Sequence, residues 1–471
     1  MIEIKILEYL TIFIGLYMAW NIGANDVANA ISTSVGSKAI KLKYALIIAG
    51  ILEFLGAYFL GGKVSQTLQS GIVRPEVFAD NYLIFAIGMI SALLATSLWL
   101  NLASLLKLPV STTHAIVGAV LGFGAMIGGV KAVNWTLVSY ISASWIVTPV
   151  ISGIFSYLIF IWVQKKILYT LSPLDATKKF LPVLVFFSIF IFIFSFLSSN
   201  NSSIGINLNV YFSTLISIIF SLLAGLIAYF LVNRLQIDSC KINTHDPSQL
   251  FSLKKTKKHL LKVNQSSKAD VYDKTKKLLD DVDEMIEEVE EKTRYSENNL
   301  EYIKIEKAFG YLQIISLCLI AFAHGTNDVA NAIGPVAAVI RTLSLQSIHF
   351  TTKIPSWILL IGAFGIIFGL MTWGWRIVET IGHKITALTP TRGFSAEFGA
   401  ATTILFASKL GLPISTTHAL VGSVLGVGLA RGLTALNLKT LKDIMVSWII
   451  TIPICAVLSI FIFFILKKIF I

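Results

Sequence analysis

The sequence predicts an all-α, polytopic membrane protein of about twelve transmembrane helices, built as an inverted repeat around a polar insert. Hydrophobic residues make up 55% of the 471 residues, and charged residues only 14%. The apolar residues fall in runs of about 17 to 25, the length of a helix that crosses a hydrocarbon core about 30 Å thick. Two polar motifs occur twice, 302 to 304 residues apart, so a whole unit has been duplicated.

Seven expected spans precede the polar insert and five follow it. They lie near 6–22, 44–61, 82–100, 114–130, 136–163, 180–199, 208–232, 309–324, 355–375, 394–408, 418–431 and 443–466. We therefore divide the chain into a first transmembrane repeat (1–165), additional spans (166–232), a charged cytoplasmic insert that is partly helical (233–307) and a second transmembrane repeat (308–471).

The insert carries both signs of charge. A basic run, Lys254 to Lys258, precedes an acidic stretch that includes Asp280 to Glu284. Apolar residues recur at helical spacing between 278 and 289, which predicts a solvated amphipathic helix or a helical hairpin. A plain cytoplasmic connector explains this pattern, and a regulatory partner site is the alternative.

The formal net charge of +12 fits the excess of Lys and Arg in cytoplasmic loops, so no nucleic-acid partner is predicted. With 233–307 in the cytoplasm, the short inside loops hold fourteen Lys and Arg residues, and the outside loops and termini hold nine. This bias predicts a multi-pass protein of the cell membrane with both termini outside. Cys240, Cys318 and Cys455 form no C-x-x-C pair, so neither a disulfide framework nor a cofactor is predicted.

The duplication defines the expected topology. The first motif, Gly23 to Ile31, reads GANDVANAI, and its copy at Gly325 to Ile333 reads GTNDVANAI. The second motif, Leu108 to Gly124, recurs at Leu412 to Gly428 with 13 of 17 positions identical. Seven spans, an odd number, lead from the first motif to its copy, so the copy is expected to cross the membrane in the opposite sense. Such inverted repeats are typical of secondary transporters, whose substrate sites lie near the midplane between the halves.

The first motif places a carboxylate among amides inside a membrane span. In a helix Asn25 and Asn29 share one face, and Asp26 lies beside Asn29. Such side chains are costly in hydrocarbon unless they are satisfied or functional. Their recurrence favours an ion or substrate site over a polar clasp between helices; the copy supplies Asn327, Asp328 and Asn331.

The second motif is expected to begin a helix, because Ser111, Thr112 and Thr113 can cap free backbone N–H groups. The polar stretch before it predicts a re-entrant or broken helix. The N-terminus of such a helix offers N–H donors, hydroxyls and a positive dipole end to an anion. Ordinary capping at the membrane surface is the alternative, but the duplication favours two helix ends aimed at one anion; the copy supplies Ser415, Thr416 and Thr417.

Further titratable residues lie near these motifs. For His114 and His418, hydrogen bonds to local backbone groups are the preferred interpretation, and a proton relay is the alternative. Glu53 and Glu397 lie within spans, where carboxylates are functional candidates. Helix N-termini invite an anion that these carboxylates would repel, unless cations lie between them or a carboxylate is protonated. Because oxygen ligands suit hard cations such as Na⁺, the residues predict cation-coupled uptake of an anion.

Both duplicated motifs resemble the signature sequences of the inorganic phosphate transporter (PiT) family, whose members are Na⁺- or H⁺-coupled phosphate permeases. The resemblance covers roughly 1–165 and 305–471 and is carried by Gly23 to Ala30, His324 to Pro335 and both Pro-x-Ser-Thr-Thr-His segments. It implies that phosphate is bound by Ser111, Thr112, Thr113, Ser415, Thr416 and Thr417, with Asn25 and Asn327. It implies that cation coupling uses Asp26, Asn29, Asp328, Asn331, Glu53 and Glu397, with Na⁺ at Asp26, Asp328 and Glu397.

One departure concerns Glu397, because the matching segment of the first half has Met89 and Ser91 and no nearby acid. Three other functions compete with a phosphate symporter. The first is a permease for sulfate or another oxyanion, and the second is a channel with inverted half-helices. The third, an intramembrane hydrolase with two aspartates, is disfavoured because each Asp is flanked by Asn, so no enzyme is predicted. The expected partners are inorganic phosphate and the lipid bilayer, and the sequence leaves homo-oligomers open.

Overall fold

The computed structural model describes residues 2–106, 108, 110–198, 208–234, 247–266, 270–296, 300–348, 354–374, 388–432 and 437–471. Within these ranges nearly every residue is helical, and the only β-type pairing is an isolated bridge between Val73 and Val133. The prediction of an all-α protein is therefore confirmed for the described part of the chain.

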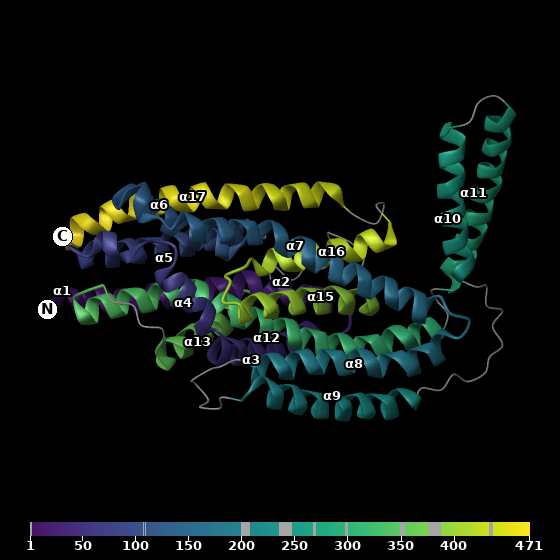
Figure 1. The fold of residues 1–471 in the computed structure, drawn as a ribbon, viewed down its shortest axis with the longest axis horizontal. Helices are drawn as coiled ribbons and strands as arrows, with labels where there is room; N and C mark the ends of the chain where they lie inside the picture. Colours follow the sequence, from purple (N-terminus) through teal and green to yellow (C-terminus); the bar gives the residue numbers. More distant parts are fainter. Residues whose placement is uncertain are drawn as a thin grey trace.

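The long helices run side by side along the long axis of the molecule (Figure 1). The first half contains α1 (Ile2–Ile22), the π-helix η1 (Gly23–Val27), α2 (Ala28–Gly36), α3 (Leu42–Leu60), α4 (Gly62–Ser70), α5 (Tyr82–Leu105), α6 (Thr112–Ile127) and α7 (Trp135–Val163). After the short η4 (Gln164–Leu168) follow α8 (Pro173–Leu197), α9 (Val210–Asn233), α10 (Pro247–Ser266) and α11 (Asp270–Ser296). The second half contains α12 (Leu300–Leu345), α13 (Ser356–Trp373), α15 (Pro390–Lys409), α16 (Thr416–Arg431) and α17 (Leu438–Phe470).

Nine helical stretches in the described residues are long and apolar enough to cross a membrane. The other three expected spans, near 114–130, 394–408 and 418–431, correspond to α6, α15 and α16. α6 and α16 have 16 residues each, and at 1.5 Å per residue such helices are about 24 Å long, less than a hydrocarbon core of about 30 Å. α15 is longer but carries Ser, Thr and Glu side chains in its buried face. Among the described residues, nine helical stretches therefore combine the length and the hydropathy of a membrane span.

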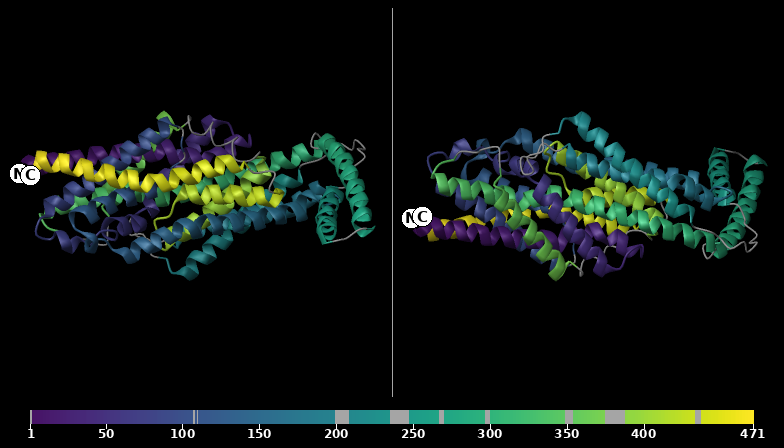
Figure 2. Two further views of the ribbon diagram at one scale, coloured as in Figure 1. Left: turned by 90° about the horizontal axis from the view of Figure 1, so that it is seen from above. Right: turned by 90° about the horizontal axis from the view of Figure 1, so that it is seen from below.

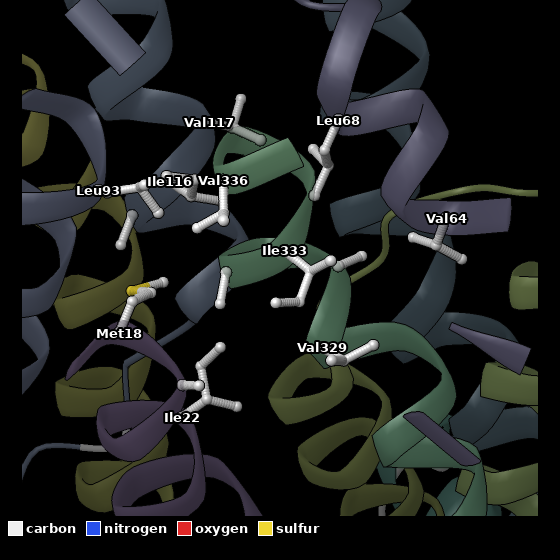
Figure 3. Packing of buried hydrophobic residues seen from close by; sticks show 14 of the residues in the cluster. Met18, Ile22, Val64, Leu68, Leu93, Ile116, Val117, Val329, Ile333 and Val336 are labelled. Carbon is white, nitrogen blue, oxygen red and sulfur yellow. The ribbon is translucent and has the colours of Figure 1, made fainter. Parts of the chain in front are cut away.

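Close backbone contacts hold the motif helices against their neighbours. A Cβ atom added at Gly23 would collide with the backbone oxygen of Ile366 on α13, and one added at Gly325 would collide with that of Glu53 on α3. Around these contacts buried apolar side chains from α1, α4, α5, α6 and α12 pack together (Figure 3), among them Met18, Leu68, Leu93, Ile116 and Val336. The absence of a side chain at these two glycines therefore lets the polar motifs sit inside a packed core.

Both chain termini lie at one end of the molecule, and the helices α10 and α11 lie at the other (Figures 1 and 2). These two helices belong to the charged insert and pack against each other as a hairpin. The insert's segments 235–246, 267–269 and 297–299 lie outside the described residues.

Candidate functional site

The two Ser-Thr-Thr-His segments meet inside the molecule, although 301 residues or more separate the contacting positions. Thr113 Oγ1 donates a hydrogen bond of 2.9 Å to the carbonyl oxygen of Ile414, and Thr417 Oγ1 donates one of 3.5 Å to that of Val110. Because each threonine reaches the backbone of the opposite segment, the two contacts are equivalent. The N-terminal ends of α6 and α16 are therefore fastened to each other. Lys107 and Pro109, just before the first segment, lie outside the described residues.

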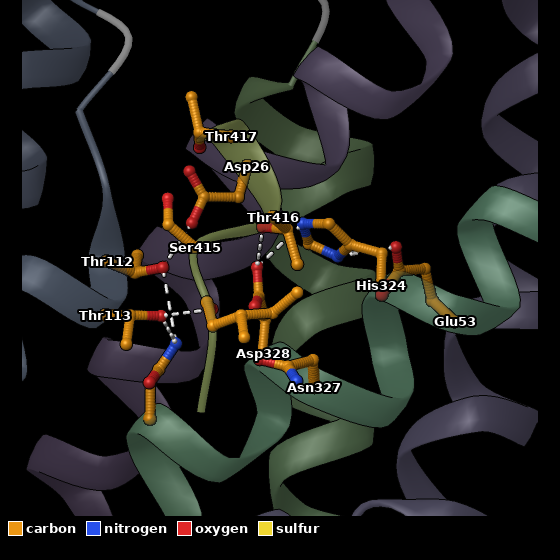
Figure 4. Close-up of polar contacts among 12 residues, drawn as sticks. Asp26, Glu53, Thr112, Thr113, His324, Asn327, Asp328, Ser415, Thr416 and Thr417 are labelled. Atoms are coloured by element: carbon orange, nitrogen blue, oxygen red, sulfur yellow. Dashed lines mark hydrogen bonds and ion pairs between the residues drawn. The ribbon is translucent and has the colours of Figure 1, made fainter. Parts of the chain in front are cut away.

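Each motif aspartate accepts a hydrogen bond from the first residue of a motif helix in its own half. Thr112 Oγ1 donates to Asp26 Oδ2, and Thr416 Oγ1 donates to Asp328 Oδ2 at 2.7 Å. Both carboxylates are buried, with exposed fractions of 1% and 0%. Figure 4 shows the two aspartates and these threonines gathered around one centre. Asp26 is positioned by η1, and π-helical turns are frequent at functional sites.

The serines of both segments cap the helices that follow them. Ser111 Oγ accepts from the backbone N–H of His114, and Ser415 Oγ accepts from that of His418, both at 3.2 Å. The capping predicted from the sequence is thus present in both copies. Each cap uses one of the free N–H groups of its helix, so the first-turn donors that remain lie at the centre where the threonines and aspartates meet.

The motif asparagines tie this centre to α5 and α15. Asn25 Nδ2 donates to Ser104 Oγ at 3.1 Å, and Asn327 Nδ2 donates to Ser408 Oγ at 2.9 Å. Asn331 Nδ2 reaches the other half, at 3.3 Å from the hydroxyl oxygens of both Thr112 and Thr113. The side chain of Asn29, its counterpart, lies outside the described residues.

Four buried acceptor oxygens at this centre have no protein donor within the described residues. They are Oδ1 of Asn25, Asp26, Asn327 and Asp328. Buried polar atoms normally have a partner. Two carboxylate and two amide oxygens can be satisfied by a cation or by a ligand that itself carries protons.

His324 was missed as a separate site residue by the sequence reasoning. Its Nδ1 atom lies 2.9 Å from Glu53 Oε1 and its Nε2 atom lies 2.8 Å from Asp328 Oδ2 (Figure 4). All three side chains are buried. The only signal for this role is the spacing, because His324 precedes Asp328 by four residues and so shares its helix face. Ligand atoms of His324, Asp328 and Asp26 lie within 4.8 Å of one another, close enough to hold one cation.

Glu397 lies in a second polar cluster and contacts none of the aspartates. Its Oε1 accepts hydrogen bonds from Thr33 Oγ1 and Ser34 Oγ, both at 2.6 Å, and from Gln313 Nε2 at 3.1 Å. Its Oε2 accepts one from Ser316 Oγ at 2.5 Å. The cluster joins α2, α12 and α15 and supplies several hard oxygen atoms around one fully buried carboxylate. This donor set fits a cation such as Na⁺.

The first half has no second cluster of this kind among its described residues. The pair Ser104 and Ser408 indicates that α15 follows α5 by 304 residues. This offset places Leu93 opposite Glu397, and Leu93 lies in the apolar core near Val336 (Figure 3). As expected from the sequence, the segment of Met89 and Ser91 provides no acid, and the residue that matches Glu397 is the apolar Leu93.

His114 and His418 bond backbone carbonyls, as preferred from the sequence, but their partners are not local. His114 Nδ1 lies 3.3 Å from the carbonyl oxygen of Trp448, and His418 Nδ1 lies 2.8 Å from that of Trp145. Each histidine thus contacts a helix of the opposite half. The two imidazole rings also meet edge to face, with centroids 4.5 Å apart. Through these contacts the two histidines pack the helices of the two halves against each other, next to the Ser-Thr-Thr segments.

The chain is similar to known phosphate transporters over nearly its whole length. A model of the phosphate transporter family matches residues 22–459. Inorganic phosphate transporter 2-1, a chloroplastic protein of Arabidopsis thaliana, is 39% identical over 470 residues, which are 99% of this chain and 73% of that protein. A solved structure of a sodium-dependent phosphate transporter is similar with a TM-score of 0.79 and 36% identity, covering 98% of this chain and 99% of that one.

Proposed function

The chain belongs to the phosphate transporter family, and from this premise we propose that it imports inorganic phosphate by symport with Na⁺. The observation that carries this proposal is the pair of Asp–Thr hydrogen bonds where the N-terminal ends of α6 and α16 meet. Because the members of this family are transporters, the intramembrane hydrolase that was considered from the sequence is excluded.

We propose that the two halves are inverted repeats that alternate access to a shared site. α1 begins at the end of the molecule that holds both termini, whereas α12 begins at the opposite end, beside the hairpin (Figure 1). The two copies of the first motif therefore run in opposite directions, which supports an inverted repeat. The twelve-segment division is part of this proposal, with α6 and α16 as re-entrant or broken helices and α15 as a polar segment.

Phosphate is proposed to bind between the N-terminal ends of α6 and α16. Helix N-termini are anion sites because their first N–H groups lack intrahelical partners. The hydroxyls of Ser111, Thr112 and Thr113 and of their copies Ser415, Thr416 and Thr417 lie at these ends. The acceptor oxygens of Asp26 and Asp328 that lack protein donors favour phosphate over sulfate, because hydrogen phosphate carries protons at neutral pH and sulfate does not.

Two places are proposed for Na⁺. One is beside Asp26 and Asp328, where cations would offset the repulsion between two carboxylates and an anion. The other is the cluster around Glu397, where hydroxyl and amide oxygens surround a buried carboxylate. Import of one negative charge into an inside-negative cell costs about 2.3 kcal/mol per 100 mV, and two Na⁺ per monoanion would reverse the sign of this term.

The proposed orientation places the hairpin in the cytoplasm and both termini outside the cell membrane. The positions of the termini and the hairpin at opposite ends of the molecule support this arrangement (Figure 2). Labelling of an engineered cysteine in the hairpin, with reagents that do not cross the membrane of intact cells, would test it.

Uptake of labelled phosphate into proteoliposomes, with and without an inward Na⁺ gradient, tests the function. We expect Na⁺-driven uptake by the natural protein, its loss in Asp328→Asn and its retention in Asp175→Asn, which removes the charge of an exposed carboxylate. Uptake that is driven by a pH gradient and does not depend on Na⁺ would show that the coupling ion is H⁺. Transport of sulfate instead of phosphate would contradict the substrate assignment, and saturation-free flux would indicate a channel.

A further inference from the structure

The hairpin α10–α11 separates its charges between its two helices. α10 contains five lysines and no acidic residue, whereas α11 contains ten acidic and five basic residues. The helices are joined across their interface by an ion pair, in which Lys257 Nζ lies 2.5 Å from Asp283 Oδ1. α10 is therefore a basic arm and α11 an acidic one.

Three further lysines of α10 lie on the side of the helix away from α11. The face packed against α11 is marked by partly buried side chains, namely Leu253, Lys257, Leu260 and Asn264. At about 100° per residue, Lys255, Lys258 and Lys262 lie on the opposite face of the helix, and all three are exposed. Leu261, which is 42% exposed, lies at the edge of this basic face.

The position of the hairpin determines what the basic face of α10 meets. Both helices run across the long axis of the bundle, with α10 nearer to the bundle and α11 on the outer side (Figures 1 and 2). A bilayer crossed by the long helices has its surface across the same axis. The face of α10 that is turned away from α11 is therefore directed towards the membrane surface.

We propose that Lys255, Lys258 and Lys262 bind anionic lipid headgroups and hold the hairpin along the bilayer surface. Lysines near a membrane are attracted to anionic lipids over about a Debye length, which is roughly 10 Å in 0.1 M salt. The acidic residues of α11 are repelled by the same surface, so the charge separation fixes which helix faces the lipid. Leu261 adds an apolar side chain that can enter the interface.

Fluorescence quenching in nanodiscs tests the contact with the full-length protein. An environment-sensitive fluorophore is attached at Leu261→Cys after replacement of the natural cysteines, and the lipids carry a quencher on their headgroups. We expect quenching to be several-fold stronger when phosphatidylglycerol is mixed into phosphatidylcholine, and to fall as salt is raised. Lys255→Glu/Lys258→Glu should abolish the difference between the two lipid mixtures.

Lys276→Glu/Lys277→Glu on α11 is the matched control, because it makes the same change in charge at exposed positions of the outer helix. It should retain the lipid-dependent quenching. Hydrogen exchange of the α11 amides, unchanged in both double variants, would show that the hairpin is intact. Equal quenching in both lipid mixtures, or equal loss in both double variants, would overturn the proposal. Absence of quenching in both mixtures would also overturn the proposal and would indicate that the basic face binds a protein partner.

Discussion

His324 Nε2 lies 2.8 Å from Asp328 Oδ2, a contact that has no counterpart among the described residues of the first half. The residue 302 positions earlier is Ile22, which is buried and apolar. Through Nδ1, His324 also connects Asp328 to Glu53 at 2.9 Å. The two halves thus share the Asp–Thr hydrogen bond but differ in the charges around it.

We predict that Glu53 and His324 act as one unit. Breaking a buried ion pair by removing one partner costs about 3–5 kcal/mol of stability, so Glu53→Gln and His324→Gln should each lower the Tm of the purified protein together with Na⁺-driven phosphate uptake. Because either single change already breaks the contact between the two residues, the double variant should be no less active than the less active of the two single variants. Initial uptake rates in proteoliposomes measure this. Losses that multiply in the double variant would show that the two residues act independently, and Ile22→Val serves as a neutral control at the matching position.

The Asp–Thr hydrogen bonds should matter in both halves. Thr112→Val and Thr416→Val remove a hydroxyl donor to a buried carboxylate without a large change of shape, and a hydrogen bond to a charged group contributes about 1.5–3 kcal/mol. We expect the KM for phosphate or the Na⁺ concentration for half-maximal uptake to rise about tenfold or more in each variant.

The serine variants are the matched controls for this prediction. Thr112→Ser and Thr416→Ser keep the donor and should retain most of the affinity. If the serine and valine variants were equally impaired, the lost methyl packing rather than the hydrogen bond would explain the effect.

The duplicated motifs are sufficient to predict which residues meet at the centre of the candidate site, because each copy contributes the same carboxylate and the same helix cap. His324, which the sequence reasoning does not identify, has no copy and stands opposite Ile22. Glu397 has no copy either and stands opposite Leu93, but its position inside an expected span identifies it from the sequence. The hydroxyl partners of Glu397 come from α2 and α12, and only the tertiary fold brings them together.

The same limit applies to the bounds of two expected spans. The apolar pattern places them near 114–130 and 418–431, whereas α6 covers Thr112–Ile127 and α16 covers Thr416–Arg431. The caps start α6 and α16 after Ser111 and Ser415, and the helices end after Ile127 and Arg431. Where a helix stops depends on local backbone geometry, such as the positive φ of 112° at Gly432, which the apolar pattern does not contain.

Substitutions in the cluster around Glu397 should change the apparent affinity for Na⁺ more than the apparent affinity for phosphate. Glu397→Gln removes a charge that four side-chain donors stabilise, and Ser316→Ala removes the donor 2.5 Å from its Oε2. We expect both variants to need a higher Na⁺ concentration for half-maximal uptake, by about tenfold or more, with a smaller change in the KM for phosphate measured at saturating Na⁺. Asp175→Asn, at an exposed carboxylate, should leave both quantities unchanged. An effect confined to the KM for phosphate would remove Glu397 from cation coupling.

The glycines of the first motif should be required for packing and not for chemistry. An alanine Cβ at Gly325 would collide with the backbone oxygen of Glu53, and one at Gly23 with that of Ile366, so the helices would have to separate. Overpacking of this kind costs about 1–3 kcal/mol, and we expect Gly325→Ala and Gly23→Ala to lower the Tm of the purified protein in detergent. Gly62 begins α4 and has no atom within 4 Å of an added Cβ, so Gly62→Ala tests the helical preference of alanine alone and should leave the Tm equal or higher. A Tm lowered equally at all three positions would show that backbone freedom, and not helix contact, is what these glycines provide.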